Sequence, residues 1–245
     1  TLKGDKIFLK PWEVHITTPG VSPEESIVNV SAGLSNSTGK KVEAAVVFKV
    51  IDPHGDEISK AETNVTINGG GSNIACANLP VAPAHLWSIE NPNLYRLQTS
   101  VYINGKEQDK EESIFGIRKI EMDAKQGFSL NGVPMKLKGG CVHHDNGILG
   151  SASFDRAEER KVELLKSAGF NAIRCAHNPP SPAMLDACDR LGMMVINENF
   201  DCWRMGKNPN DYHLFFEDWW EKDTKAMIYR DFNHPSIIMW SIGNE

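Results

Sequence analysis

The sequence predicts a multidomain chain, with an immunoglobulin-like antiparallel β-sandwich over residues 1–122 and a parallel α/β domain over residues 123–245. Three observations support this prediction. In the first part, apolar and polar residues alternate with a period of two, which is typical of half-buried strands. In the second part, helical stretches alternate with short apolar strands, which indicates a parallel sheet. A chain of 245 residues can also form two domains, each with its own core.

In the first part, turn signals separate the expected strands. Strands are expected at residues 28–34, 42–50, 65–67 and 97–103. A turn at residues 52–55 and the pair Asn104 and Gly105, which is typical of a two-residue hairpin, connect some of them. The charged run at residues 107–112 is interpreted as a solvated turn.

In the second part, a short hairpin is expected at residues 128–134 before the strands and helices begin to alternate. Parallel strands are predicted at residues 135–138, 171–175, 194–198 and 237–242. The first helix is expected to begin with a capping box of Asp155 and Glu158 and to end at Gly169. The second has Ser181 as its N-cap and ends at Gly192, and a longer helix covers residues 214–231.

This order of elements predicts right-handed crossovers between parallel strands. Half of a (β/α)₈ barrel and an open doubly wound sheet share the pattern. No glycine-rich phosphate loop follows the first strand, which disfavours a nucleotide-binding fold. The pattern therefore favours the barrel but leaves both architectures open.

Composition narrows the classes of partner. The net charge of −6 argues against nucleic acid or an anionic membrane as a partner. No apolar run approaches the ~18 residues of a transmembrane helix. The five cysteines show no paired CxxC spacing, so buried free thiols are expected rather than a zinc site. The chain begins at Thr1 rather than Met, so we expect that the natural N-terminus was removed.

Polar side chains gather after all four expected parallel strands. They are His143, His144, Arg174, His177, Glu198, Asp201, Trp203, Asn244 and Glu245. In a barrel, the carboxyl ends of the strands open on one face, where active sites lie. We therefore expect one common site, with helix capping and loop solubility as the alternative explanation.

These residue types fit the recognition of a sugar. Carboxylates, amides, imidazoles and guanidinium groups hydrogen-bond hydroxyls, and an indole packs on the apolar face of a pyranose. Glycoside hydrolysis needs two carboxyl groups, about 5–5.5 Å apart in retaining enzymes. Glu245 is one candidate, and Glu198 and Asp201 are expected to position the substrate or tune Glu245. A metal cluster of His143, His144 and His177 is the competing interpretation.

Residues 233–245, which read NHPSIIMWSIGNE, resemble the acid/base signature of glycoside hydrolase family 2. This family contains β-galactosidases, β-glucuronidases and β-mannosidases. Further resemblances to its motifs follow the family's order, at residues 86–95, 115–118, 171–180 and 195–203. The resemblance covers essentially the whole chain and implies that the α/β domain is the first half of a (β/α)₈ TIM barrel.

The resemblance also implies a retaining mechanism. Glu245 would be the general acid and then the general base, and Asn244 would bind the sugar 2-hydroxyl. The other polar residues at the strand ends would shape the sugar subsite. The nucleophilic glutamate would lie on a later strand, so we expect an inactive internal fragment that can self-associate through the open edges of a half barrel. The family's N-terminal jelly roll has no counterpart here, and residues 8–19 are interpreted as the linker that leaves it.

Two departures from the family pattern bear on the chemistry. Metal-dependent members carry Glu-x-His beyond the third strand, where this chain has residues 202–204 (Cys-Trp-Arg). We therefore expect no metal and no other cofactor. Asn197 also precedes Glu198, where many members have Asp. The favoured function is an exo-acting β-galactosidase, with β-glucuronidase, β-mannosidase or a non-catalytic carbohydrate-binding module as alternatives.

Overall fold

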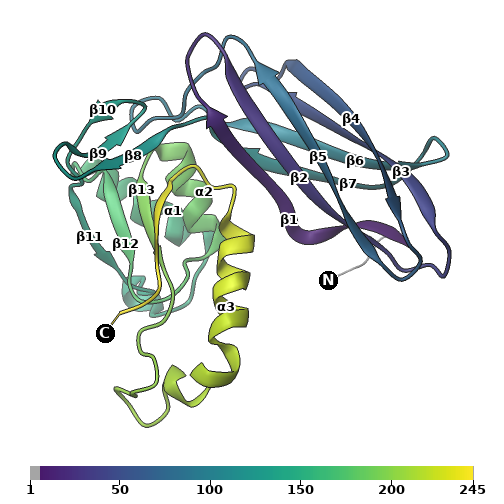
Figure 1. Ribbon diagram of the computed structural model, residues 1–245. Coiled ribbons are helices and arrows are strands. Elements are labelled where there is room, and N and C mark those ends of the chain that lie inside the picture. Colours follow the sequence, from purple (N-terminus) through teal and green to yellow (C-terminus); the bar gives the residue numbers. More distant parts are fainter. Residues whose placement is uncertain (1–5, 245) are drawn as a thin grey trace. The chain divides into compact units, whose positions relative to one another are not determined.

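The computed structural model describes residues 6–244, which form two compact units (Figure 1). The first unit contains residues 6–86 and Asn93–Lys119. The second contains Trp87–Pro92 and residues 120–244. No helix within residues 6–244 is both long enough and apolar enough to cross a membrane.

The first unit is a sandwich of two antiparallel sheets. One sheet has the order β1 (Ile7–Gly20), β2 (Ser26–Asn36), β5 (Ser72–Val81). The other has the order β4 (Glu57–Ile67), β3 (Val42–Ile51), β6 (Tyr95–Ile103), β7 (Lys106–Phe115). Alternate side chains of β2 and β3 are buried in a common core: Val28, Val30, Ala32, Leu34, Ala44, Val46, Phe48 and Val50. The predicted sandwich is thus confirmed, and its period-two pattern arises because each strand buries one face.

Two predictions for this unit are wrong. Residues 8–19 are not a linker, because they lie within β1, which pairs with β2 and places Val14 and Ile16 in the core. Residues 107–112 are not a turn, because they lie within β7, which pairs with β6. β7 is the outer strand of its sheet, and charged side chains are common on such strands because they face water and discourage pairing with other chains.

The second unit begins with a small antiparallel sheet of β8 (Ile120–Asp123), β9 (Gly127–Leu130) and β10 (Val133–Pro134). A parallel sheet follows, in the order β11 (Gly139–Val142), β12 (Ala172–Cys175), β13 (Met194–Glu198), β14 (Ile237–Ser241). The helices between these strands are η1 (Gly147–Leu149), α1 (Asp155–Ser167), α2 (Pro182–Leu191), η2 (Tyr212–Leu214) and α3 (Phe216–Asp231). This is the first half of a (β/α)₈ barrel, as predicted.

Element boundaries follow the local signals in most places, but the parallel strand predicted at residues 135–138 is wrong, because the strand lies at Gly139–Val142 (β11). Ser181 accepts a hydrogen bond from the Met184 N–H and caps α2, and Gly192 ends that helix in the left-handed conformation. The capping box predicted for α1 is wrong, because the N-cap is Phe154 and no side chain caps it. Glu158 is instead buried, and its carboxylate accepts a hydrogen bond from the side-chain amide of Asn146.

The core of the second unit decides which face of the parallel sheet carries the site. Val162 of α1 and Leu185 of α2 pack with Ile173 and Val195 in one buried cluster. Side chains alternate along a strand, so the residues next to these core positions point to the opposite face. The polar residues at the ends of β12 and β13 are therefore on the side away from α1 and α2.

Candidate active site

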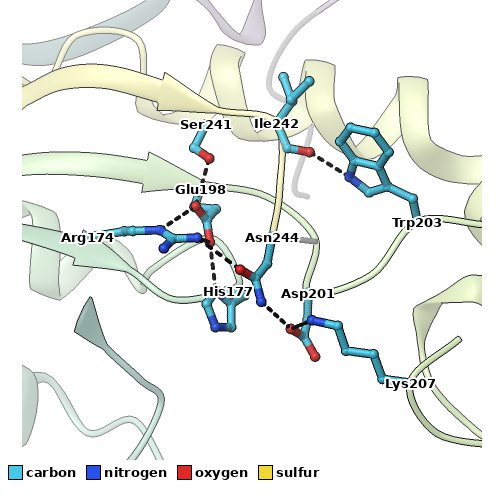
Figure 2. Close-up of polar contacts among 9 residues, drawn as sticks. All are labelled: Arg174, His177, Glu198, Asp201, Trp203, Lys207, Ser241, Ile242 and Asn244. Atoms are coloured by element: carbon cyan, nitrogen blue, oxygen red, sulfur yellow. Dashed lines mark hydrogen bonds and ion pairs between the residues drawn. The ribbon is translucent and has the colours of Figure 1, made fainter. Parts of the chain in front are cut away.

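Glu198, the last residue of β13, is the centre of a hydrogen-bonded cluster (Figure 2). Its side chain is fully buried. Arg174, from the neighbouring strand β12, donates two bonds, from Nε to Oε2 at 2.7 Å and from Nη2 to Oε1 at 2.9 Å. His177 Nδ1 lies 2.8 Å from Oε1, and the hydroxyl of Ser241 on β14 donates to Oε2 at 2.7 Å. Three adjacent strands thus converge on one carboxylate.

These contacts determine the charge of Glu198. Burial opposes ionisation, but the hydrogen bonds from Arg174, Ser241 and His177 outweigh it and lower the pKa of Glu198. The same contact raises the pKa of Arg174. A bidentate pair of this kind fixes both side chains in one orientation. Glu198 is therefore a fixed anion with its oxygens occupied, which suits a positioning role rather than proton transfer.

The side-chain amide of Asn244 is held between Arg174 and Asp201. Arg174 Nη2 donates to its Oδ1 at 3.3 Å, and its Nδ2 donates to Asp201 Oδ1 at 3.2 Å (Figure 2). The cation on one side and the carboxylate on the other specify which end of the amide is oxygen. One amide N–H remains available to a ligand, because an amide nitrogen has two donors. The residue that precedes Glu245 is thus oriented by charge.

Gly243 lets the chain reach this position. Its φ of +139° lies in the region that favours glycine. A Cβ atom there would lie 2.9 Å from the Phe200 carbonyl oxygen and 2.6 Å from Trp203 Nε1. The chain around it is fixed by two bonds, from the Asn244 N–H to the Phe200 oxygen at 2.9 Å and from the Trp203 indole to the Ile242 oxygen at 3.1 Å.

Next to the cluster is a cavity of about 620 Å³. Its lining is formed by Trp203, Arg204, Met205, Ile242, Gly243 and Asn244. The Trp203 ring is partly exposed there and stacks on Phe216 of α3, with 6.4 Å between the ring centres. Asp201 lies beside it, and the bonds from Lys207 at 2.9 Å and from Asn244 lower the pKa of Asp201. An apolar wall next to fixed polar groups is what a pyranose ring requires.

The structure brings together most, but not all, of the predicted site residues. Arg174, His177, Glu198, Asp201, Trp203 and Asn244 lie in the network or line the cavity. His143 is exposed, and its ring contacts that of His177 edge-on, with 5.3 Å between centres. His144 joins none of these contacts among the described residues. Glu245, the predicted catalytic residue, lies outside them.

The donor groups near this site do not favour the competing metal-binding interpretation. Two groups of three or more ligand side chains converge within residues 6–244, and neither contains His143, His144 or His177. Residues 202–204 carry a thiol, an indole and a guanidinium group, and none of these is an oxygen ligand that Mg²⁺ prefers. This stretch therefore does not fit a magnesium ion.

Two members of the network were not predicted from the sequence. Ser241 completes the shell of Glu198, and Lys207 binds Asp201. The register of β13 and β14, which pairs Glu198 with Ser241, could have identified Ser241. Lys207 lies in a loop, and no sequence signal marks its contact.

Comparison with known proteins agrees with this geometry. Family models match the TIM barrel domain of glycosyl hydrolases family 2 over residues 120–245, and glycosyl hydrolases family 2 over residues 12–118. A β-galactosidase, BoGH2A of Bacteroides ovatus, is 40% identical over 99% of this chain and 29% of its own length. A putative β-glucuronidase of Formosa agariphila is 36% identical over 96% of this chain and 22% of its own length.

Solved structures show the same relationship. A glycosyl hydrolase family 2 member from Bacteroides cellulosilyticus superposes with a TM-score of 0.94 at 44% identity, over 97% of this chain and 31% of that chain. A β-glucuronidase from Bacteroides uniformis gives a TM-score of 0.84 at 28% identity, over 97% of this chain and 29% of that chain.

A sandwich followed by half a barrel, with carboxylates and amides at the strand ends, is the architecture of the solved glycoside hydrolases that this chain resembles. Within that class, the chain belongs to glycosyl hydrolases family 2. It spans less than a third of the length of the first relatives it matches.

Proposed function

We propose that this chain contributes the acid/base half of the active site of a retaining exo-glycoside hydrolase that acts on terminal β-linked sugars. The observation that carries the proposal is the orientation of Asn244. Its amide is held by Arg174 and Asp201, directly before Glu245 in the sequence. Such a fixed amide can bind a sugar hydroxyl more strongly in the transition state than in the ground state.

In the proposed reaction, Glu245 donates a proton to the glycosidic oxygen while a second carboxylate attacks the anomeric carbon. The bond to the leaving sugar or aglycone breaks, and a covalent glycosyl-enzyme forms. Glu245 then takes a proton from water, which attacks the same carbon and releases the nucleophile. We assign the nucleophile to the part of the relatives that this chain does not cover, so the chain alone should not turn over substrate.

Burial and charge argue against Glu198 or Asp201 as that nucleophile. Glu198 is fully buried and accepts four hydrogen bonds, so its lone pairs are not available for attack. Asp201 is bound to Lys207 and to the amide of Asn244. We assign both carboxylates to the sugar subsite, with Trp203 as the apolar platform.

The favoured substrate is a β-galactoside. The sequence of residues 241–245 is closer to the β-galactosidase form of the family signature. The relative that is 40% identical is named a β-galactosidase. A β-glucuronide is the second candidate, because several relatives are named β-glucuronidases.

Aryl glycosides test the proposal. A protein that carries this chain within the full length of its family should release the aryl group from the β-galactoside faster than from the β-glucuronide or β-mannoside. The chain of 245 residues should release none. Binding of sugars without turnover by the longer protein would contradict the enzymatic proposal and favour a carbohydrate-binding module.

We also propose that the chain alone self-associates. β11 and β14 are the outer strands of the parallel sheet within the described residues, and an unpaired strand edge can pair with another chain. Trp240 and Ile242 near the β14 edge are exposed. Light scattering should detect dimers or larger species, and a monomer at all concentrations would contradict this proposal.

A further inference from the structure

We propose that Asp52, His54 and His85 form a binding site for a divalent transition-metal ion, with zinc the best fit, in the first unit. This site lies outside the proposed glycosidase chemistry and does not depend on it.

The geometry brings three ligand atoms together. One carboxylate oxygen of Asp52 and one ring nitrogen each of His54 and His85 lie within 4.8 Å of one another. The two imidazoles meet edge-on, with 5.4 Å between centres and 88° between planes. A tetrahedral ion with bonds of about 2.05 Å separates its ligands by about 3.3 Å. An ion would therefore draw together ligand atoms that now lie within 4.8 Å of one another.

The backbone fixes the Asp52 end of the site. Asp52 begins the turn between β3 and β4, and its Oδ1 accepts bonds from the N–H groups of His54 and Asp56, both at 2.9 Å. These two bonds hold the carboxylate in one orientation. Its Oδ2 receives no hydrogen bond from residues 6–244. The turn thus uses one oxygen and leaves the other for a ligand.

The His85 end is fixed independently. Its backbone N–H donates to the hydroxyl oxygen of the buried Tyr95 at 2.7 Å. The neighbouring Ala84 N–H donates to the Pro23 carbonyl at 2.9 Å. His85 is half-buried and His54 is exposed, so water and ions can reach the cluster. The ring nitrogens of His54 and His85 make no hydrogen bond within the described part of the chain.

A second cluster shows why these free atoms matter. Asp186, Asp189 and His234 also converge within 4.8 Å. There, however, Asp189 uses one oxygen for the Ser236 N–H at 3.0 Å and the other for His234 Nδ1 at 2.6 Å. Both oxygens of Asp189 thus already have hydrogen-bond partners. In the Asp52 cluster, one carboxylate oxygen and the ring nitrogens have none among residues 6–244, and a cation would bind them.

The donor set selects the kind of ion. Two imidazoles and one carboxylate suit zinc, cobalt or nickel, whereas Mg²⁺ and Ca²⁺ prefer oxygen ligands throughout. Three protein ligands leave at least one position for water. The ion would join the turn after β3 to the segment after β5, so we infer that it fastens the sandwich at one end.

Zinc titration tests the inference. We would titrate Zn²⁺ into the metal-free full chain in competition with a chromophoric chelator, with the exposed Cys76 and Cys141 replaced by serine to remove thiol ligands. One equivalent should bind and raise the temperature of unfolding. His54→Ala and His85→Ala should each weaken binding by about tenfold or more, because even residues that only support a ligand contribute that much.

Two further variants separate coordination from folding. Asp52→Asn keeps the oxygen that accepts the two N–H bonds but removes the charge, so it should fold normally and still lose affinity. His15→Ala, in β1 of the same unit, should leave binding unchanged. Absence of binding by the unsubstituted histidine cluster would overturn the inference, as would undiminished binding in a folded His54→Ala, His85→Ala double variant.

Discussion

Replacing Glu198 with glutamine is the sharpest structural test of the site, because it keeps the shape and removes the charge. Each Glu198 oxygen accepts one bond from Arg174, and each also accepts a second bond, from His177 or Ser241. In Glu198→Gln, one oxygen becomes an NH₂ group. Whichever way the amide turns, a donor then faces a donor of Arg174. The side chain cannot satisfy its shell in either orientation.

The magnitude follows from burial. Breaking a fully buried ion pair costs about 3–5 kcal/mol. The Arg174 side chain is 34% exposed, so water recovers part of this loss. We therefore expect Glu198→Gln to lower the free energy of unfolding by about 3 kcal/mol. With a urea dependence of about 2 kcal/mol per molar, the unfolding midpoint should fall by about 1.5 M.

Tryptophan fluorescence during urea unfolding measures this change. Every tryptophan except Trp12 lies in the second unit, so the signal reports mainly on the half barrel. Glu163→Gln is the matched control, because Glu163 pairs with Arg156 on the exposed surface of α1. Its midpoint should change by less than about 0.3 M, since exposed pairs contribute little. Equal shifts for the two variants would refute the reasoning.

The pH dependence has a definite sign. The pKa of Glu198 is lowered in the folded state, so its stabilising contribution is present above the unfolded value of about 4.3 and is lost as pH falls through the folded value. The difference in unfolding free energy between wild type and Glu198→Gln should therefore be constant from pH 6 to 8 and shrink below about pH 4. A difference that grows with acidification would contradict this assignment.

Two further predictions concern packing. Gly139→Ala should destabilise the second unit by more than about 2 kcal/mol, because the new Cβ would lie 1.7 Å from the Ala172 carbonyl oxygen. Gly140→Ala is the control, since the space at its Cβ is open. Equal temperatures of thermal unfolding for the two variants would contradict this close packing. Burial raises the pKa of the Cys175 thiol to about 12. A thiol reagent should therefore modify only the exposed Cys76 and Cys141 until urea is added. Rapid modification of all five cysteines without urea would show that the core is open.

Much of the fold could be predicted because burial repeats at the period of each element. Burial alternates along most of β2 and β3, since one face of each lies in the core. Ser181 and Gly192 predicted the two ends of α2, because they satisfy backbone groups there. These signals are local, so a single sequence contains them in full.

The errors occurred where tertiary position overrides local composition. β1 lies at the edge of its sheet and contains Pro11, and its pairing shifts register between Leu9 and Val14. An edge strand tolerates proline and irregular pairing, so its pattern resembles that of a linker. β7 is an edge strand too, and its charged residues resemble those of a turn. Composition alone cannot distinguish these cases.

The candidate site was partly predictable for a geometric reason. Parallel strands bring their carboxyl ends to one edge, so the convergence of Arg174, Glu198 and Asn244 follows from the order of elements. Contacts that depend on the path of a loop did not follow. Neither the bond from Lys207 to Asp201 nor the approach of His54 to His85 has a signature in the spacing of the sequence.

The most direct test of the central claim is the rate of aryl β-galactoside hydrolysis by a full-length family protein that carries Glu245→Gln within this chain. If Glu245 donates the proton, kcat/KM, which reports the first step alone, should fall by about 10²–10⁴ for substrates with poor leaving groups and far less for good leaving groups, which need no protonation. An equal loss for all leaving groups, or no loss, would contradict the account.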